Sequence, residues 1–382
     1  MFILTAHIDM GVEMSRYHLA LLCVSGIGSV SAGKILAEFP EAERAFGASV
    51  ARLRELGLSA RQAEALAGFR DFSPVERMEE QIAASGQRAL AFTDPEYPAA
   101  LRTLHSPPPV VFVRGDINIK TELAASVVGT RQPTPYGLKV AEHLGAALSR
   151  SGICTVSGGA RGIDAQAHRG ALNAGGPTVA VLGAGLDVPY PPEHVTLFEQ
   201  IVAAGGALLG ELPPGTPPMR GSFPARNRLL AGLGRACVVV EAGEKSGALI
   251  TARLAMEQGK TVLAVPGRID RAQSRGVNRL IRDGAKPLLE ILDVVEEVLG
   301  EHLNRGHAED EAATAMRAQL PPPPGDAGKI WDRLVGADAD ADELAVKTGL
   351  SAAQVNAALL ELELAGRVRR LPGNRYAVTQ EV

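Results

Sequence analysis

Cysteine, aromatic residues and long apolar runs are all scarce in this chain of 382 residues. Its three cysteines, Cys23, Cys154 and Cys237, lie in apolar runs without Cys-x-x-Cys spacing, which argues against a disulfide framework and fits a reducing compartment. No apolar run has the length of a membrane span, and the N-terminus lacks the charged and apolar regions of a signal peptide. We therefore expect a cytoplasmic protein that does not contact a membrane.

The net charge is also slight, at −4, which excludes a broadly basic nucleic-acid binder but not a local basic site. Hydrophobic residues make up 46% of the chain, aromatics only 4%, and there are 42 glycines. This composition suits an α/β protein in which helices pack closely on a sheet, and the length allows two or three domains.

Most sequence signatures of catalysis are missing as well. The chain has no His-Glu-x-x-His pattern and no His/Cys cluster, so we expect no metal. The dinucleotide fingerprint is incomplete, because Val188 stands where a third glycine should follow Gly183-Ala184-Gly185. A near match to a Walker A loop ends in Ile35, where Ser or Thr must hold Mg²⁺. We expect no cofactor and no enzymatic activity.

Two residue pairs keep a hydrolase open as an alternative. Asp164 and His168 are four residues apart on a predicted helix and could form an acid–base pair, although we interpret them as a helix-terminal acid and a structural histidine. Glu211 and Glu241 follow predicted strands and could serve a nucleotide-phosphate hydrolase. Neither pair has a recognisable nucleophile or metal partner.

Apolar segments alternate with helical patterns between residues 110 and 300. The segments are rich in Val, Ile, Leu and Ala, as strands buried on both faces should be. The alternation predicts a Rossmann-like, doubly wound parallel sheet, which binds ligands beyond the carboxyl ends of its strands. The expected strands are Ala124–Gly129, Ile153–Val156, Thr178–Leu182, Ala207–Gly210, Ala236–Glu241 and Thr261–Val265.

Smaller regions flank this block on both sides. Residues 1–109 show helical patterns and predict an N-terminal SAM-like domain, in which Val24-Ser25-Gly26-Ile27-Gly28 resembles a helix-hairpin-helix turn. Such a turn either offers backbone N–H groups to phosphate or joins the helices of an interaction domain. Residues 301–326 are acidic and contain four consecutive prolines, which predicts a linker. Residues 327–382 show a helix-turn-helix and a hairpin, which predict a C-terminal winged helix.

The most informative segment, Val156–Asp164, reads Val-Ser-Gly-Gly-Ala-Arg-Gly-Ile-Asp. It joins a predicted strand to a predicted helix, so its backbone N–H groups and the helix N-terminus converge where an anion could bind. The guanidinium of Arg161 adds donors that fit phosphate. A tight turn without a ligand is the alternative, because glycine-rich turns recur in unrelated α/β folds.

Charge is distributed unevenly along the chain. Residues 220–286 hold thirteen Lys or Arg and five Asp or Glu, whereas residues 290–343 hold four and fourteen. One anion-binding half and one acidic arm are typical of a protein that grips a polyanion on a single domain. The run Phe223–Arg228 places a ring beside two arginines, a combination that lets a base stack while the arginines hold phosphates.

Several motifs of the middle block, in their order along the chain, resemble those of the DNA-processing protein A (DprA) family. The flanking helical domain and winged helix match a layout seen in that family. The motifs are Val128–Arg131, Ser157–Asp164, Ala180–Gly183, Phe223–Arg228, Val239–Ala242, Ser246–Arg253 and Ala264–Gly267.

The resemblance implies a non-enzymatic protein that binds single-stranded DNA through its Rossmann-like domain. It also implies loading of a RecA-type recombinase during natural transformation and a homodimer built through that domain, with single-strand-binding protein as a further candidate partner. Charge and position add Lys260 and Arg268 to the DNA-binding residues taken from the motifs. Those residues are Gly129, Arg131, Ser157, Gly158, Gly159, Arg161, Gly162, Phe223, Arg226, Asn227 and Arg228.

The winged helix is expected to contribute little to this binding. Its predicted recognition helix begins with Ser351, Gln354 and Asn356 and contains no Lys or Arg, whereas a helix that reads a DNA groove usually carries some. We therefore expect a protein-contact role or weak DNA binding. Four wing arginines, Arg367, Arg369, Arg370 and Arg375, argue the other way.

Overall fold

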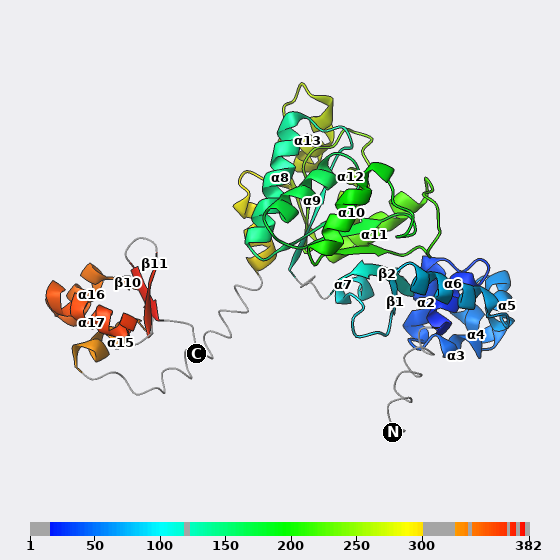
Figure 1. Ribbon diagram of the computed structural model, residues 1–382, viewed down its shortest axis with the longest axis horizontal. Helices are drawn as coiled ribbons and strands as arrows, with labels where there is room; N and C mark the ends of the chain where they lie inside the picture. Colours follow the sequence, from blue (N-terminus) through cyan, green and yellow to red (C-terminus); the bar gives the residue numbers. More distant parts are fainter. Residues whose placement is uncertain are drawn as a thin grey trace. The chain divides into compact units, whose positions relative to one another are not determined.

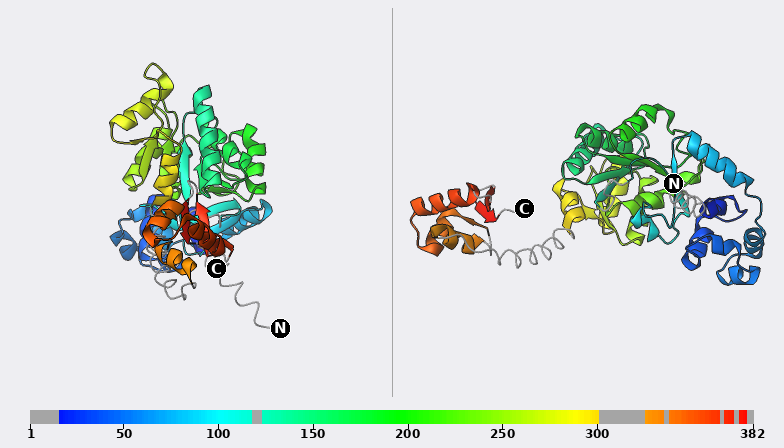
Figure 2. Two further views of the ribbon diagram at one scale, coloured as in Figure 1. Left: turned by 90° about the vertical axis from the view of Figure 1, so that its left-hand side faces the viewer. Right: turned by 60° about the horizontal axis from the view of Figure 1, so that its bottom comes forward.

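The computed structural model describes residues 16–117, 123–300, 325–334, 338–364, 367–371 and 375–378. The chain forms two compact units, Met1–Gly300 and Glu301–Val382. The first unit contains the N-terminal helices and a large sheet with helices packed on it, and the second is a small helical unit with a hairpin (Figures 1 and 2). None of the helices in the described ranges is long and apolar enough to cross a bilayer.

Nine strands of the described residues form one twisted sheet in the order β1-β2-β6-β5-β4-β3-β7-β8-β9. Strands β3 to β9 run parallel, whereas β1 and β2 pair antiparallel at one edge. The strands are β1 (Arg88–Ala91), β2 (Val110–Gly115), β3 (Ala124–Val128), β4 (Cys154–Ser157), β5 (Thr178–Leu182), β6 (Ala207–Gly210), β7 (Ala236–Val239), β8 (Thr261–Ala264) and β9 (Lys286–Pro287).

The expected Rossmann-like sheet is confirmed, since the six predicted strands correspond to β3–β8. The prediction missed three strands. β1 lies inside the block that we expected to be helical, because its sequence Arg-Ala-Leu-Ala has more helix than strand propensity. The β-branched run Val110–Val113 does carry a strand signal for β2, whereas β9 has two residues and carries none.

Helices cover both faces of the sheet. Alternate residues of each strand face opposite sides, so Val127 belongs to one apolar cluster and Val128 to another. The cluster with Val127 contains side chains of α8 (Pro135–Arg150), α9 (Ile163–Asn173) and residues 292–300. The cluster with Val128 contains side chains of α7 (Ala99–Arg102), α11 (Ser222–Leu233), α12 (Ala248–Glu257) and α13 (Arg275–Arg282).

Helices α8 and α9 approach each other so closely that their contact admits only glycine. A Cβ atom on Gly145 would lie 2.1 Å from the carbonyl oxygen of Ala167, and one on Gly170 would lie 2.1 Å from that of Glu142. Backbone therefore packs on backbone. The contact brings together the loops that precede the two helices, and these loops carry Arg131 and Arg161.

The N-terminal helices span residues 16–23, α2 (Ser29–Glu38), α3 (Glu43–Phe46), α4 (Val50–Glu55), α5 (Ala60–Ala67) and α6 (Ser73–Ala84). The expected hairpin turn is present, and a second one joins α4 to α5. Side chains from the neighbouring helices fix both turns. The Gln62 amide of α5 donates to the carbonyl oxygen of Gly26 in the first turn over 2.7 Å, and the Lys34 ammonium of α2 donates to that of Gly57 in the second over 3.3 Å.

The second unit is the predicted winged helix. It consists of α15 (Asp326–Leu334), β10 (Ala339–Asp340), α16 (Ala341–Thr348), α17 (Ala352–Leu364), β11 (Val368–Leu371) and β12 (Arg375–Val378). Its hydrophobic core includes Trp331, Leu344 and Leu359. The predicted linker lies outside the described residues except for its last two positions, of which Asp326 begins α15.

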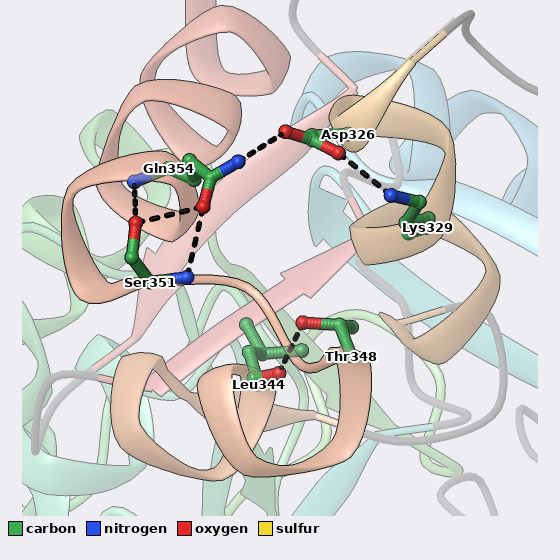
Figure 3. A network of polar contacts seen from close by, with 6 residues as sticks. All are labelled: Asp326, Lys329, Leu344, Thr348, Ser351 and Gln354. Carbon is green, nitrogen blue, oxygen red and sulfur yellow. Dashed lines mark hydrogen bonds and ion pairs between the residues drawn. The ribbon is translucent and has the colours of Figure 1, made fainter.

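Side chains at the N-terminus of α17 form hydrogen bonds with one another and with the backbone there (Figure 3). The Gln354 side-chain oxygen accepts hydrogen bonds from the backbone N–H and the hydroxyl of Ser351, at 3.0 and 2.8 Å. The amide of Gln354 also donates to Asp326 over 3.1 Å, and Asp326 accepts from Lys329 over 2.9 Å. Two of the three polar residues at the start of the presumed recognition helix are therefore engaged within the unit.

Candidate nucleic-acid interface

The main hollow of the first unit lies where the strand order reverses. The chain proceeds from β3 to β4, β5 and β6 on one side, then returns to β7 on the other side of β3. An open sheet of this kind leaves a crevice at the carboxyl ends of the strands beside the reversal. A hollow of about 780 Å³ occupies that place, lined by residues 128–132 at the end of β3, by 243, 245–248, 250 and 251 after β7, and by the first half of α11.

An aromatic and a cationic side chain form one wall of this hollow. Phe223 projects from the first turn of α11 and is half-buried. Its ring centroid lies 5.3 Å from that of Tyr190, and the guanidinium carbon of Arg131 lies 5.6 Å from it. The Ser222 hydroxyl fixes this turn by donating to the carbonyl oxygen of Gly183 over 2.5 Å. The wall therefore offers a ring face beside an exposed cation, which suits stacking of a base with its phosphate nearby.

A buried arginine lies beneath the glycine turn. Arg226 donates to the carbonyl oxygen of Gly158 over 3.0 Å, while the N–H of Gly158 donates to the Asp164 carboxylate over 3.1 Å. A Cβ atom on Gly158 would lie 2.6 Å from that carboxylate and 2.8 Å from the guanidinium, so only glycine fits between them. The arrangement holds the turn in place and positions Arg226 at the floor of the hollow.

Burial changes the protonation behaviour of both charged groups. Desolvation raises the pKa of Asp164 to about 6, although the positive charge of Arg226 and hydrogen bonds from Ala160 and Gly158 oppose the rise. Desolvation also lowers the pKa of Arg226 to about 10, and the Asp164 carboxylate opposes that change. Arg226 is therefore charged at neutral pH, and Asp164 loses its proton close to neutrality.

Arg161 lies at the rim, where the carboxylate of Glu193 pairs with it. This ion pair raises the pKa of Arg161 and lowers that of Glu193. Both side chains are about half exposed, at 52% and 47%, so a phosphate can compete with Glu193 for the guanidinium. Together with Arg131, Phe223 and Arg226, Arg161 lines a smaller hollow that adjoins the main one.

The remaining glycines and Asn227 shape the site. Gly162 begins α9 with φ +80°, and a Cβ atom there would lie 2.5 Å from the carbonyl oxygen of Thr130. Gly129 packs on Ile163, and the carbonyl oxygen of Gly159 bonds to the ring of His194 over 2.9 Å. Asn227 lines the hollow and donates to the carbonyl oxygen of Gly247 over 3.4 Å. These residues let the loops after β3 and β4 approach each other.

Two expected DNA-binding residues are engaged in hydrogen bonds within the protein. The Ser157 side chain is fully buried, and its hydroxyl donates to the carbonyl oxygen of Val127 over 2.6 Å, so the hydroxyl is occupied within the sheet. Arg228 donates to Glu211 over 2.6 Å with 17% of its side chain exposed, and it lines neither hollow. Glu211 also accepts from Ser29 over 2.7 Å, so this arginine belongs to the attachment of α2.

Two other expected residues lie outside the main hollow because of their positions along the sheet. Lys260 precedes β8 and so lies at the amino end of that strand, at the edge opposite the hollow. Arg268 follows β8 at the correct edge, but it lines a separate hollow with Tyr136 and Arg271. Arg268 is also paired with Asp270, with two bonds of 3.0 and 2.9 Å.

Tyr190, Arg220 and Lys245 are among the residues of the main hollow that were missing from the expected set. Arg220 and Lys245 are exposed and lie within the basic segment, so charge together with their place in predicted loops could have found them. Tyr190 comes from the loop between β5 and α10 (Val195–Ala203), and nothing in the sequence there marks it as a neighbour of Phe223.

The residues that favoured a hydrolase are engaged elsewhere. His168 bonds to the Thr178 hydroxyl over 2.8 Å, and burial lowers its pKa to about 3, so it does not pair with Asp164. Glu241 accepts from the backbone and hydroxyl of Thr134 at 2.9 and 2.5 Å, and it thereby fixes the start of α8. Across the described residues, no group of three or more His, Cys, Asp or Glu side chains could hold a metal ion.

Comparison with known proteins places these features in a family. The family described as DNA recombination-mediator protein A matches residues 88–299, and the DprA winged helix domain matches residues 314–374. Protein Smf of Synechocystis sp. is 36% identical over 390 residues, which cover 94% of this chain and 98% of that protein.

Two solved structures of the same kind have similar folds. The X-ray structure of DNA processing protein A from Streptococcus pneumoniae aligns with a TM-score of 0.64 at 32% identity, over 74% of this chain and 97% of that one. DNA processing protein A from Helicobacter pylori, for which a single-stranded DNA binding mode is described, aligns with a TM-score of 0.51 at 32% identity. That alignment covers 56% of this chain and 96% of the other.

Proposed function

The chain belongs to the DNA recombination-mediator protein A family, and on this basis we propose that it binds single-stranded DNA in the main hollow and loads a RecA-type recombinase onto that strand. The setting we propose is the cytoplasm of a bacterium that takes up DNA by natural transformation. The proposal assigns no cofactor and no catalytic step to the protein.

One observation carries the proposal: the hollow combines a ring face with cations at several depths. Phe223 is available for stacking, Arg131 lies at the rim, Arg226 lies at the floor, and Arg161 lines the smaller hollow that adjoins the main one. Stacking is tolerant of sequence because every base has a ring face, and arginines hold phosphates by paired hydrogen bonds. A duplex hides its base faces, so this combination favours a single strand.

The test is a comparison of labelled dT oligonucleotides with duplexes of equal length over a series of salt concentrations. We expect tighter binding of the single strand, with a salt slope of roughly 0.7 for each phosphate contact. Arg131→Ala should weaken binding strongly, since a hydrogen bond to a charged group contributes roughly 1.5–3 kcal/mol. Arg114→Ala, which removes an arginine paired with Glu199 and lining neither hollow, is the control. Duplex affinity equal to or above single-strand affinity would overturn the proposal.

A homodimer through the Rossmann-like sheet is part of the proposal. Strand β9 is at the edge of the sheet, and the residues just after it expose Leu289 and Leu292 by 76% and 60%. Exposed leucines beside the sheet edge suit a self-complementary contact through side chains, because Lys286 and Pro287 disfavour pairing of the edge strand itself. Light scattering should give twice the chain mass, and Leu289→Arg combined with Leu292→Arg should give the mass of one chain.

Recombinase loading is tested separately from strand binding. A single strand coated with single-strand-binding protein, the further partner we propose, resists recombinase filaments, so filament growth on it should speed up when this protein is added. Arg131→Ala should abolish the acceleration, because the mediator must first hold the strand. Acceleration that persists in a variant without single-strand affinity would argue against this mechanism.

A further inference from the structure

A second hollow, of about 420 Å³, lies at the same sheet edge as the main one. The two are separated only by the loops after β3 and β7, since Gln132 and Gly243 line the main hollow and Thr134 and Glu241 line the second. Consecutive Cα atoms are about 3.8 Å apart, so Gln132 and Thr134 lie within about 7.6 Å of each other. A single strand that leaves the main hollow on this side would enter the second one directly.

Tyr136 is the aromatic side chain of the second hollow. It belongs to the first turn of α8, which is fixed by the bonds of Thr134 to Glu241 and by the bond from the Gly137 N–H to Thr134. The side chain is nevertheless 55% exposed, and no hydrogen bond or ring contact within the described part of the chain involves it. A ring on a rigid support with a free face can stack on a base at little entropic cost.

Two arginines reach the same hollow from the loop after β8. The side-chain amide of Asn278 clamps this loop, because it bonds to both the N–H and the carbonyl oxygen of Gly267 at 3.1 and 2.8 Å. The backbone N–H of Arg271 then closes a turn onto the carbonyl oxygen of Arg268 over 3.2 Å. Asp270 partly neutralises Arg268, whereas no ion pair of Arg271 occurs among the described residues. Arg271 is therefore the stronger candidate for a phosphate.

We propose that the second hollow is an extension subsite for single-stranded nucleic acid, in which one base stacks on Tyr136 while Arg271 holds a neighbouring phosphate, with Arg268 assisting. The inference rests on the proposed function, because the same strand must first occupy the main hollow. It adds a length requirement: only a strand long enough to pass the loops after β3 and β7 reaches Tyr136.

The test measures the affinity of the full-length protein for labelled dT oligonucleotides of about 4 to about 16 nucleotides, the span of site sizes typical of single-strand-binding folds. Wild type should bind oligonucleotides above a threshold length more tightly than shorter ones. Tyr136→Ala should bind the longer oligonucleotides about tenfold more weakly than wild type does, a difference of roughly 1.4 kcal/mol. Short oligonucleotides should bind wild type and Tyr136→Ala equally. Arg271→Ala should behave like Tyr136→Ala, and Tyr136→Phe should behave like wild type.

Matched controls are available nearby. Lys139→Ala changes an exposed residue of α8, and Arg279→Ala changes an exposed arginine of α13; neither residue lines the main or the second hollow, so both variants should follow wild type at every length. A thermal melt reports whether α8 survives the Tyr136 substitution. As a second readout, 5-iodouracil placed beyond the threshold should cross-link to Tyr136 under ultraviolet light.

The outcomes separate this inference from the proposed function. If Arg131→Ala weakens binding at every length while Tyr136→Ala matches wild type throughout, the subsite is wrong and the proposed function stands. If Tyr136→Ala weakens the shortest oligonucleotides as much as the longest, Tyr136 belongs to the main hollow and the length requirement is wrong. If wild type binds no dT, both the subsite and the proposed function are contradicted.

Discussion

Arg131 lies over the ring of Phe223 on one wall of the main hollow, with the guanidinium carbon 5.6 Å from the ring centroid. The arginine comes from the loop after β3 and the ring from α11, 92 residues later in the numbering. No ion pair holds Arg131 among the described residues, so a base that stacks on the ring would have the guanidinium close to its phosphate.

Phe223→Ala should weaken single-strand binding by about tenfold or more, since stacking contributes roughly 1–3 kcal/mol per base. Fluorescence anisotropy with labelled dT measures the loss. Phe223→Trp keeps a ring at the same place and should retain most of the affinity. Equal affinities of the alanine variant and wild type would show that Phe223 only packs against Tyr190.

Glu193→Gln should tighten single-strand binding by up to about fivefold, because it releases Arg161 from an exposed ion pair worth roughly 0–1 kcal/mol. The gain should shrink as salt is raised. Glu199→Gln opens a comparable pair with Arg114 away from the hollows and should leave the affinity unchanged. Weaker binding by the Glu193 variant would mean that this ion pair positions Arg161 for DNA rather than competing with it.

Arg228→Ala should destabilise the first unit by about 2 kcal/mol, because it leaves the largely buried carboxylate of Glu211 without its cation. The DNA affinity of this variant should stay within about twofold of wild type. Urea unfolding and anisotropy measure the two effects. The double variant with Glu211→Ala should recover part of the stability, as expected for coupled partners. A large loss of DNA binding without loss of stability would restore Arg228 to the binding site.

Asp164 should make both stability and affinity depend on pH. Its pKa is raised to about 6 in the folded protein, against about 3.9 for an ordinary aspartate. Its contribution to stability is therefore fully present below about pH 4 and is lost as the pH rises through about 6. Protonation also removes a negative charge beside Arg226, so single-strand affinity should rise as the pH falls from about 7.5 to about 5.5.

Asp164→Asn isolates this effect, because an amide has the shape of the carboxyl but does not titrate. The difference between wild type and the variant in unfolding free energy should change between about pH 4 and about pH 6, and the difference in dissociation constant should change around pH 6, near the raised pKa of Asp164. Parallel profiles for the two proteins would assign the pH dependence to other groups.

Deletion of the winged helix, by ending the chain at Pro324, should cost less than tenfold in single-strand affinity, or about 1.4 kcal/mol. The exposed face of α17 carries no basic side chain, and Ser351 and Gln354 close its N-terminus. On the wing side, Arg375 is paired with Asp338 and Arg367 lies over the ring of Trp331. The measurement is a titration of labelled single strand with the truncated protein and with the full chain at the same salt concentration. A loss of affinity greater than tenfold would show that the winged helix contacts the DNA.

The sequence was sufficient for six of the parallel strands, β3 to β8, but not for β9 or for every neighbour of the hollow. Runs of Val, Leu and Ala that end in glycine mark β3 and β5, because a doubly buried strand tolerates little else. Tyr190 carries no such mark, since its contact with Phe223 depends on the path of a loop. Long-range packing of this kind is set by the whole fold and leaves no local pattern.

Two of the expected residues that lie away from the main hollow could have been recognised by geometry alone. Arg226 and Arg228 are two apart on a helix, which separates their directions by about 200°, so one faces the hollow and the other cannot. Lys260 precedes its strand and so had to lie at the amino edge. Ser157 is different: its place at a strand end was right, but only the packing of β4 shows that its hydroxyl points to Val127.

The glycine contact between α8 and α9 bears on how variants of this protein should be read. Gly145 and Gly170 lie behind the sheet edge, far along their helices from any proposed ligand, yet each has no room for a methyl group. An alanine there is the mildest substitution available and favours a helix by propensity, but it would wedge the two helices apart at their crossing. The loops at their front ends would then separate, and Arg131 and Arg161 with them. A screen for variants that lose DNA binding should therefore recover substitutions at these two glycines as readily as substitutions of the arginines.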